Sequence, residues 1–210
     1  MKFKDCGNTP LGIYPVVDRA YKLKPLYEEG ITTAQLRVKD MTGDVLEKEV
    51  IEAIKISEAY DARFFLNDFW ELGIKHKTYG IHLGQEDIQE ADVEAIFDAD
   101  IRLGISTHTT NEIQIAMAFE PSYLAIGPIF ETTSKKMVYN PVGIEDLKRW
   151  AIDVDYPIVA IGGINIDNIK EVALTKSANG IAMISDVLEE GEVSQERTTA
   201  LMRAFEKYAG

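Results

Sequence analysis

Short apolar segments recur along the whole chain at spacings that predict strands. Most of them are continuously hydrophobic, which is typical of parallel strands buried on both faces. Eight such segments are rich in β-branched or aromatic residues, and we expect each to form a strand. They are residues 11–18, 32–39, 63–68, 79–84, 101–107, 123–130, 156–163 and 180–187.

Segments with helical periodicity lie between these strands. The clearest is 47–60, in which Val50 and Ile54 share one apolar face while charged residues occupy another. The first connection, 20–30, is short and carries Pro25, which disfavours a helix there. We expect the other helices at 110–119, 143–150, 167–174 and 194–208.

A strand followed by a helix, repeated eight times without a linker or a break in composition, predicts a (β/α)8 TIM barrel of the α/β class. We expect a single domain over residues 1–210, with the strand–helix repeats running from about 11 to 208. The chain is at the compact end of the size range of this fold. An open α/β sheet is the alternative that the same alternation allows.

Composition narrows the classes of function. No stretch of 18 uninterrupted apolar residues occurs, so we expect no membrane span. The net charge of −13 argues against nucleic acid as a partner, because such binding depends on contacts between cations and phosphates. The N-terminus has no apolar signal core, and Cys6, the single cysteine, cannot form an internal disulfide. We therefore expect a cytoplasmic protein.

Two aspartates mark the ends of neighbouring predicted strands. Asp68 ends the segment 63–68, and Asp87 follows the segment 79–84. In a barrel the chemistry lies at the carboxyl ends of the strands, so these carboxylates should meet. Paired carboxylates suit a hard divalent cation that keeps waters for a substrate phosphate to displace. The alternative for Asp68 is a simple helix N-cap.

Basic and polar side chains follow other strands. Gln35, Arg37 and Lys39 alternate along one strand, so all three should point to the same side. Lys135 and Lys136 follow the sixth strand. Carboxylates beside cations predict a pocket for a polyphosphate ester, although a structural ion pair is an alternative for Arg37.

Further polar residues end the third, fourth and fifth strands. They are Asn67, His82, and Ser106 with His108. The histidine at 82 should face the barrel interior, where a buried core histidine and a catalytic one are equally compatible with the pattern.

A phosphate cradle is expected between the seventh and eighth strands. Glycines at 162 and 163 allow close approach to the backbone, and Ile184 and Ser185 lie at the end of the eighth strand. The loop 132–136 supplies hydroxyl and ammonium groups that could close over a ligand, unless it is only a solvated loop.

Several motifs of the chain, some of them long, lie between about residue 11 and residue 187. They are AQLRVKD at 34–40, LNDFW at 66–70, YGIHLGQED at 79–87, LGISTH at 103–108, YLAIGPIF at 123–130, TTSK at 132–135, IVAIGGI at 158–164 and AMIS at 182–185. Together, and in this order, these motifs resemble the thiamine-phosphate synthase (thiamine-phosphate pyrophosphorylase) family.

The resemblance implies a Mg²⁺-dependent transferase of thiamine biosynthesis. Such an enzyme joins 4-amino-2-methyl-5-(diphosphooxymethyl)pyrimidine to 4-methyl-5-(2-phosphooxyethyl)thiazole and releases pyrophosphate. Asp68 and Asp87 would be the metal ligands, and Arg37, Lys39, Lys135 and Ser106 the catalytic residues. The expected contacts to the pyrimidine diphosphate are Gln35, Arg37, Lys39, Asn67, Ser106 and Lys135. The expected contacts to the thiazole phosphate are Thr132, Thr133, Ser134, Gly163, Ile184 and Ser185.

The residues agree with that chemistry. An aminopyrimidine ring donates charge to its exocyclic carbon, so the diphosphate can leave if its charge is neutralised. The attacking thiazole nitrogen carries no proton, so no general base is needed. The lack of an obvious nucleophile–base pair in the sequence therefore favours this function.

Two residues depart from the family pattern. Glu131 stands where proline is usual, and Asp186 replaces a small residue after Ser185. Both add negative charge near a phosphate site, and we expect Asp186 to point away from it.

Three other functions remain as alternatives. A related thiazole tautomerase shares the barrel and the thiazole-phosphate cradle, but such proteins typically lack the aspartate pair. An aldolase could form a Schiff base at Lys39, and a barrel that only binds a phosphorylated ligand needs no catalysis. In every case the expected partners are small phosphorylated molecules, and we expect no binding to nucleic acid or to a membrane. The sequence is compatible with a homo-oligomer.

Overall fold

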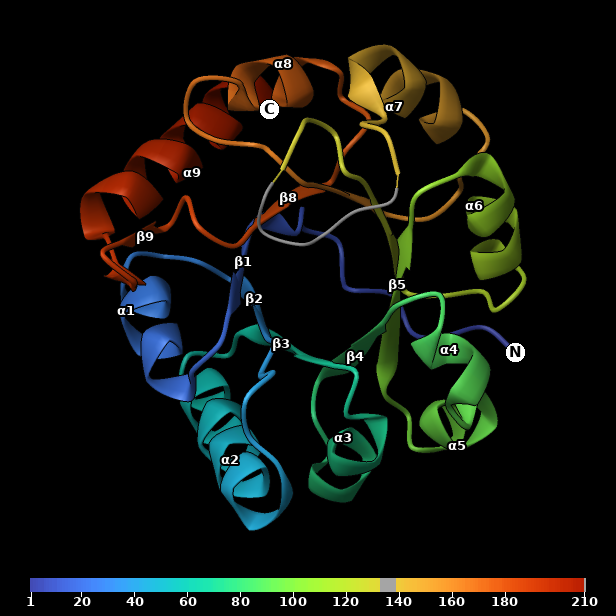
Figure 1. Ribbon diagram of the computed structural model, residues 1–210, viewed down its shortest axis with the longest axis vertical. Helices are drawn as coiled ribbons and strands as arrows, with labels where there is room; N and C mark the ends of the chain where they lie inside the picture. Colours follow the sequence, from blue (N-terminus) through green and yellow to red (C-terminus); the bar gives the residue numbers. More distant parts are fainter. Residues whose placement is uncertain (133–138, 210) are drawn as a thin grey trace.

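The computed structural model describes residues 1–132 and 139–209. Within these residues eight parallel strands close into a barrel, in which each strand pairs with the next along the chain and β8 pairs with β1 (Figure 1). The open-sheet alternative is therefore wrong. The barrel strands are β1 (Gly12–Val17), β2 (Thr33–Leu36), β3 (Arg63–Asn67), β4 (Gly80–Leu83), β5 (Arg102–Thr107), β6 (Tyr123–Ile126), β7 (Ile158–Ile161) and β8 (Gly180–Met183).

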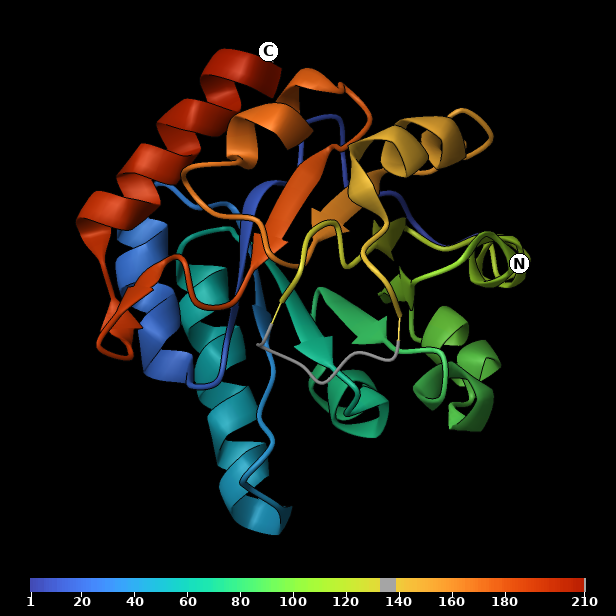
Figure 2. The ribbon, with the colours of Figure 1, turned by 45° about the horizontal axis from the view of Figure 1, so that its top comes forward.

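Helices surround the barrel, as the two views in Figures 1 and 2 show. No helix in the described part of the chain is long and apolar enough to cross a membrane. The helices are η1 (Ala20–Lys22), α1 (Leu23–Glu28), α2 (Gly43–Ala59), α3 (Trp70–His76), α4 (Asp87–Glu90), α5 (Val93–Asp98), α6 (Thr110–Met117), α7 (Gly143–Ala151), α8 (Ile169–Leu174) and α9 (Gln195–Ala209). A short hairpin, β9 (Leu188–Glu189) and β10 (Glu192–Val193), precedes α9.

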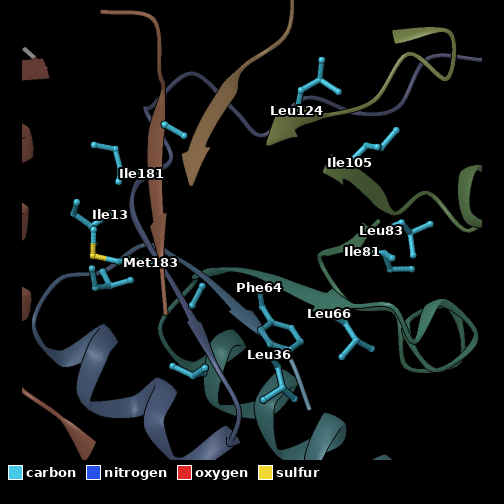
Figure 3. Close-up of a cluster of buried hydrophobic side chains, with 14 of the residues drawn as sticks. Ile13, Leu36, Phe64, Leu66, Ile81, Leu83, Ile105, Leu124, Ile181 and Met183 are labelled. Atoms are coloured by element: carbon cyan, nitrogen blue, oxygen red, sulfur yellow. The ribbon is translucent and has the colours of Figure 1, made fainter. Parts of the chain in front are cut away.

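The strand alternation sorts side chains into two cores. In β3, Phe64 and Leu66 belong to the core between barrel and helices, whereas Phe65 belongs to the core inside the barrel. This is why the strands read as continuously apolar, since both faces are buried. Figure 3 shows part of the outer core, to which Ile13, Leu36, Ile81, Leu83, Ile105, Leu124, Ile181 and Met183 also contribute.

Aromatic rings fill the middle of the barrel. The ring of Tyr123 lies 5.1 Å from that of Phe65 and 6.0 Å from that of Tyr14, measured between centroids. Two of these rings, Tyr123 and Phe65, occupy space that a glycine leaves on a neighbouring strand. A Cβ at Gly104 would lie 2.2 Å from Tyr123 Cζ, and one at Gly80 would lie 2.3 Å from Phe65 Cε1. Large and small residues are thus matched across adjacent strands.

The N-terminal segment closes the amino end of the barrel. The guanidinium of the buried Arg63 donates hydrogen bonds to the carbonyl oxygens of Cys6, Thr9 and Pro10, and to Thr32 Oγ1. A buried cation requires such acceptors. The other end of the barrel, where the strands finish, remains available for chemistry.

The expected elements are confirmed with shorter strands. The helix α2 begins at Gly43, before the expected start, and Pro25 lies in the first turn of α1, where proline is tolerated. The short helices α3, α4 and α5 and the hairpin β9–β10 were not predicted, because two to seven residues are too few to show a period.

Candidate active site

A cavity of about 350 Å³ opens at the carboxyl ends of the barrel strands. Side chains from all eight strands line it, and it is within the size range of small-molecule sites. This is the end at which barrels of this kind carry their chemistry. Tyr14 and Tyr123, two of the aromatic rings described above, form its floor.

The two predicted metal ligands meet at the rim of this cavity. Asp68 follows β3, and Asp87 begins α4; both line the cavity. Burial raises the pKa of the Asp87 carboxyl, and the nearby negative charge of Asp68 raises it further. The Gly84 backbone N–H donates to Asp87 Oδ2 at 3.2 Å, which holds this carboxylate in place.

Asp68 adopts an unusual backbone conformation. Its φ of 65° lies in the left-handed region, which aspartate and asparagine tolerate better than most residues. Its backbone N–H donates to the carbonyl oxygen of His82 at 3.0 Å. The residue at the N-cap of α3 is Phe69, not Asp68, so the N-cap alternative is wrong. The turn directs the Asp68 carboxylate toward the cavity.

The donor set fits a magnesium ion better than a metal that needs a full protein cage. Among residues 1–132 and 139–209, no three side chains of His, Cys, Asp or Glu gather around one point. Mg²⁺ commonly takes one or two carboxylates and completes its shell with water and substrate phosphate. Two facing carboxylates, one with a raised pKa, are the arrangement that a cation would stabilise.

Gln35 of β2 and the basic residues of the loop after it face the same cavity. Gln35, Arg37 and Lys39 all line it, as their alternation predicts. Lys39 Nζ lies 2.5 Å from Asp68 Oδ2, so this cation also borders the carboxylate pair. In the described part of the chain no carboxylate pairs with the Arg37 guanidinium, which leaves the ion-pair alternative without a partner.

A second, smaller cavity of about 50 Å³ lies between the ends of β7 and β8. It is lined by Thr132, Gly163, Ile184 and Ser185, four of the residues expected around the thiazole phosphate. Gly163 has a φ of 67°, and a Cβ there would lie 2.4 Å from the Glu131 carbonyl oxygen. Only glycine therefore allows the loop after β6 to pack this closely on the loop after β7.

The expected orientation of Asp186 is wrong. This residue lines the small cavity, and the Ser185 hydroxyl donates to Asp186 Oδ2 at 3.1 Å. The neighbouring hydroxyl provides a local donor, which is enough to turn the carboxylate toward the cavity. The predicted phosphate cradle thus contains a negative charge.

Some predicted residues cannot be placed. Thr133, Ser134, Lys135 and Lys136 lie outside the described residues, so their expected roles stay predictions. Thr132, at the start of that loop, is half-buried and borders both cavities.

His82 is both buried and part of the site. Its Nδ1 lies 2.7 Å from Tyr123 Oη, and its Nε2 lies 2.8 Å from Ser106 Oγ. Tyr123 Oη is in turn 2.9 Å from Tyr14 Oη, to which Gln35 Nε2 donates at 3.2 Å. Sequence reasoning missed the two tyrosines. The available signal was a hydroxyl at an inward position of an otherwise apolar strand.

His108 forms a second polar cluster at the cavity wall. Glu112 accepts the backbone N–H of His108 at 2.7 Å, and its Oε2 lies 2.8 Å from His108 Nδ1. The Tyr139 hydroxyl donates to Glu112 Oε1 at 2.9 Å, and the Tyr139 ring stacks on the His108 ring with centroids 4.5 Å apart. These contacts fasten residue 139 to the start of α6.

Comparison with known proteins decides the family. A family model described as thiamine monophosphate synthase matches residues 13–187. This chain belongs to that family. It is 46% identical over 180 residues to a thiamine-phosphate synthase of Serratia proteamaculans (strain 568), covering 85% of this chain and 84% of that protein. A thiamine-phosphate synthase of Salmonella newport (strain SL254) is also 46% identical, over 181 residues, with 85% of each chain covered.

Solved structures agree with this assignment. A thiamine phosphate pyrophosphorylase from Pyrococcus furiosus superposes with a TM-score of 0.83 at 29% identity, covering 95% of this chain and 98% of that one. The N-(5'-phosphoribosyl)anthranilate isomerase of the same organism superposes with a TM-score of 0.69 at 11% identity, covering 93% of this chain and 99% of that one. At that identity the likeness shows a shared barrel fold and nothing about the reaction.

Proposed function

We propose that this protein synthesises thiamine phosphate from 4-amino-2-methyl-5-(diphosphooxymethyl)pyrimidine and 4-methyl-5-(2-phosphooxyethyl)thiazole, with release of pyrophosphate. The observation that carries the proposal is one cavity in which two facing carboxylates, Asp68 and Asp87, lie beside the guanidinium of Arg37, which pairs with no carboxylate of the described residues. A diphosphate needs positive charge around it as it leaves, and this cavity can supply that charge from both side chains and a bound cation.

The pyrimidine diphosphate would bind over the ends of β2 to β5. Gln35 and Asn67 lie deeper in the cavity, where an uncharged ring can be held, and both are buried. Arg37 and Lys39 lie nearer the rim, where their charges would neutralise the diphosphate. Ser106 would donate a hydrogen bond from the end of β5, and Lys135 is expected to add a further cation.

Asp68 and Asp87 would hold Mg²⁺, which supplies neutralisation of the departing pyrophosphate when it is bound. The chain's own part is to keep the two carboxylates together. The left-handed turn at Asp68 and the hydrogen bond from Gly84 to Asp87 do so before any ligand arrives. Preorganisation of this kind avoids rearrangement during the reaction.

The thiazole phosphate would occupy the smaller cavity. Backbone N–H groups of Gly163 and Ile184 and the hydroxyl of Thr132 are suitable donors. The Ser185 hydroxyl would turn from Asp186 to the phosphate, and Thr133 and Ser134 are expected to contribute. Because Thr132, Gly162 and Ile184 line both cavities, a thiazole held by its phosphate can reach the pyrimidine carbon. Orientation of two bound substrates supplies most of the required catalysis, since no proton must be removed from the attacking nitrogen.

The aspartate pair favours this function over the tautomerase alternative, which has no diphosphate to neutralise. Lys39 is a poor candidate for a Schiff base, because its ammonium group is ion-paired with Asp68. A location in the cytoplasm is also part of the proposal. Burial raises the pKa of the lone Cys6 thiol to about 11, so this cysteine is an unreactive core residue.

The test is turnover of the two purified substrates, with product thiamine phosphate and pyrophosphate measured together. We expect both products in equal amounts with Mg²⁺ and none after treatment with EDTA. Addition of Mg²⁺ should restore activity. Turnover of the thiazole alone would favour the tautomerase, and binding of both substrates without any product would favour the non-catalytic alternative.

A further inference from the structure

A continuous hydrogen-bonded chain crosses the barrel interior beneath the cavity. It runs from Gln35 on β2 through Tyr14, Tyr123 and His82 to Ser106 on β5. The consecutive distances are 3.2, 2.9, 2.7 and 2.8 Å. All five residues line the cavity; Gln35, Tyr14, Tyr123 and His82 are buried, and Ser106 is half-buried. The chain therefore connects two sides of the site through the floor.

The first donor in the chain sets the direction of every later bond. Gln35 Nε2 can only donate, so Tyr14 Oη accepts from it. Among the described residues, Tyr123 Oη is the one acceptor within hydrogen-bond distance of the Tyr14 hydroxyl proton. Tyr123 then accepts from Tyr14, and its own proton must go to His82 Nδ1.

That order determines the protonation of the histidine ring. If Nδ1 accepts from Tyr123, a neutral His82 carries its proton on Nε2. Nε2–H then donates to Ser106 Oγ. The Ser106 hydroxyl proton is left over, and the open side of Ser106 is the cavity.

The reverse order leaves a buried group unsatisfied. If Ser106 donated to Nε2, then Nδ1–H would donate to Tyr123 and Tyr123 to Tyr14. Among the described residues the Tyr14 hydroxyl proton would then have no acceptor, on a side chain that is only 1% exposed. A buried hydroxyl proton without an acceptor is unfavourable, so the first order is preferred.

The two tyrosines keep their protons under ordinary conditions. Burial raises the pKa of Tyr14 and of Tyr123 well above the usual value for tyrosine. Each hydroxyl therefore contributes one donor and at least one acceptor, as the ordering requires.

We propose that Tyr14, Tyr123 and His82 are positioning residues that hold the Ser106 hydroxyl as a hydrogen-bond donor to the cavity ligand. This identification of the ligand rests on the proposed function: the Ser106 hydroxyl would donate to an oxygen of the leaving diphosphate. The proton stays on Ser106 Oγ throughout, so no bond is formed or broken within the chain. A hydroxyl already turned toward the place where charge develops needs no rearrangement when the diphosphate departs.

The tautomer of His82 is directly measurable. We would label the histidines of the full-length protein with ¹⁵N and record long-range ¹H–¹⁵N spectra of the ligand-free protein. The signals of His82 can be assigned from their loss in His82→Gln. We expect the proton on Nε2 and an unprotonated Nδ1. A proton on Nδ1, or on both nitrogens, would overturn the proposal whatever reaction the protein catalyses.

Two variants break the chain above the histidine. Tyr123→Phe removes the donor to His82 Nδ1, so we expect a second tautomer to appear and kcat to fall about tenfold. The KM for the thiazole phosphate should change little, because that substrate lies in the other cavity. Tyr14→Phe leaves Tyr123 in place and should produce the same changes to a smaller extent; it also serves if Tyr123→Phe does not fold.

Tyr27→Phe is the matched control. Tyr27 is also a buried tyrosine, and its hydroxyl lies 2.8 Å from Ser57 Oγ, away from the cavity. Loss of this hydroxyl should leave the His82 signals and kcat unchanged. A fall in kcat equal to that of Tyr123→Phe would mean that loss of packing explains both variants, which overturns the proposal.

A double mutant separates positioning from structure. In a Ser106→Ala background the chain has no hydroxyl to orient, so adding Tyr123→Phe should lower kcat by less than twofold. A further tenfold fall would show that Tyr123 acts without Ser106. If neither the variants nor the wild type made thiamine phosphate, the proposed function would be wrong. The NMR measurement of the His82 tautomer would still test the order of the hydrogen bonds independently.

Discussion

At the scale of single residues, the backbone of Asp68 makes this position selective. Its φ of 65° is strained for most side chains, but asparagine tolerates it as well as aspartate does. Asp68→Asn therefore removes the charge while keeping the turn. Asp87→Asn also keeps the shape of its loop, because an asparagine has nearly the same size and retains an oxygen that can accept the Gly84 N–H.

We expect Asp68→Asn and Asp87→Asn each to lower kcat/KM by about a hundredfold or more, because the site loses half of its cation-binding charge. Steady-state kinetics at several Mg²⁺ concentrations would measure this. Asp153→Asn, which changes an exposed carboxylate on the loop after α7, is the control and should keep full activity. Normal activity of the Asp68/Asp87 double variant would remove the metal from the mechanism.

Arg37 should serve mainly the diphosphate substrate. We expect Arg37→Ala to lower kcat and to raise the KM for the pyrimidine diphosphate, since the charge on the leaving group grows in the transition state. Arg37→Lys keeps the charge and should recover part of the loss. A rise confined to the KM for the thiazole phosphate would show that the two cavities are assigned the wrong way round.

The carboxylate of Asp186 should weaken phosphate binding. It lies in the small cavity and accepts the Ser185 hydroxyl proton that a phosphate would otherwise receive. We expect Asp186→Gly to lower the KM for the thiazole phosphate severalfold with little change in kcat, because a repulsive charge is removed.

Asp186→Asn distinguishes charge from hydrogen bonding at the same position. It keeps an acceptor for Ser185 and removes the negative charge, so it should give most of the improvement seen with glycine. An unchanged KM in both variants would mean that the carboxylate turns away when substrate binds.

At the scale of elements, the strands were predictable and the short helices were not. The strands are apolar on both faces, which makes them stand out in the sequence. Helices α3, α4 and α5 have too few turns to show a period, and contacts with the barrel stabilise them instead. Gln35, Arg37 and Lys39 could be placed on one wall from strand alternation alone.

The polar clusters beneath and beside the cavity required the structure. The hydrogen bonds from Tyr14 through Tyr123 to His82 join strands that are distant in the sequence, and no local sequence pattern predicts them. The contact between Glu112 and Tyr139 is of the same kind. The direction of Asp186 also could not be predicted, because it depends on one local hydrogen bond.

Glu112 should contribute measurably to stability. It accepts from the backbone N–H of His108 and from the Tyr139 hydroxyl, and its Oε2 contacts the His108 ring. We expect Glu112→Ala to lower the free energy of unfolding by about 1–3 kcal/mol, because these groups lose their acceptor. Urea unfolding would measure it. Glu112→Gln keeps one acceptor oxygen and should be milder; equal losses would show that the charge, not the hydrogen bonds, matters.

At the scale of the whole molecule, the two ends of the barrel have separate roles. The N-terminal segment, held by Arg63, closes one end, while the other end carries both cavities. The closed barrel and the location of its site were predictable from the repeat of strand and helix. The closure at the amino end was not, because it depends on main-chain acceptors of an irregular segment.

Arg63→Met tests this separation. The change keeps the apolar stem and removes the hydrogen bonds to Cys6, Thr9 and Pro10. We expect the free energy of unfolding to fall by about 2 kcal/mol, since three carbonyl groups, that of the buried Cys6 among them, lose a donor, while kcat stays the same. Thermal unfolding and kinetics on the same sample would decide it. A large fall in kcat without loss of stability would contradict the separation of roles.

The close fit between Gly104 and Tyr123 has a consequence for how the protein can evolve. Any side chain at position 104 would collide with the tyrosine ring, so residue 104 cannot grow unless residue 123 first becomes smaller. That first step removes the hydroxyl on which His82 depends. Substitution of residue 104 first produces a collision, and substitution of residue 123 first lowers activity. Either order of single substitutions therefore passes through an impaired protein. Lineages that retain the reaction should inherit the pair together, and a laboratory library that varies both positions at once would be the way to reach other solutions.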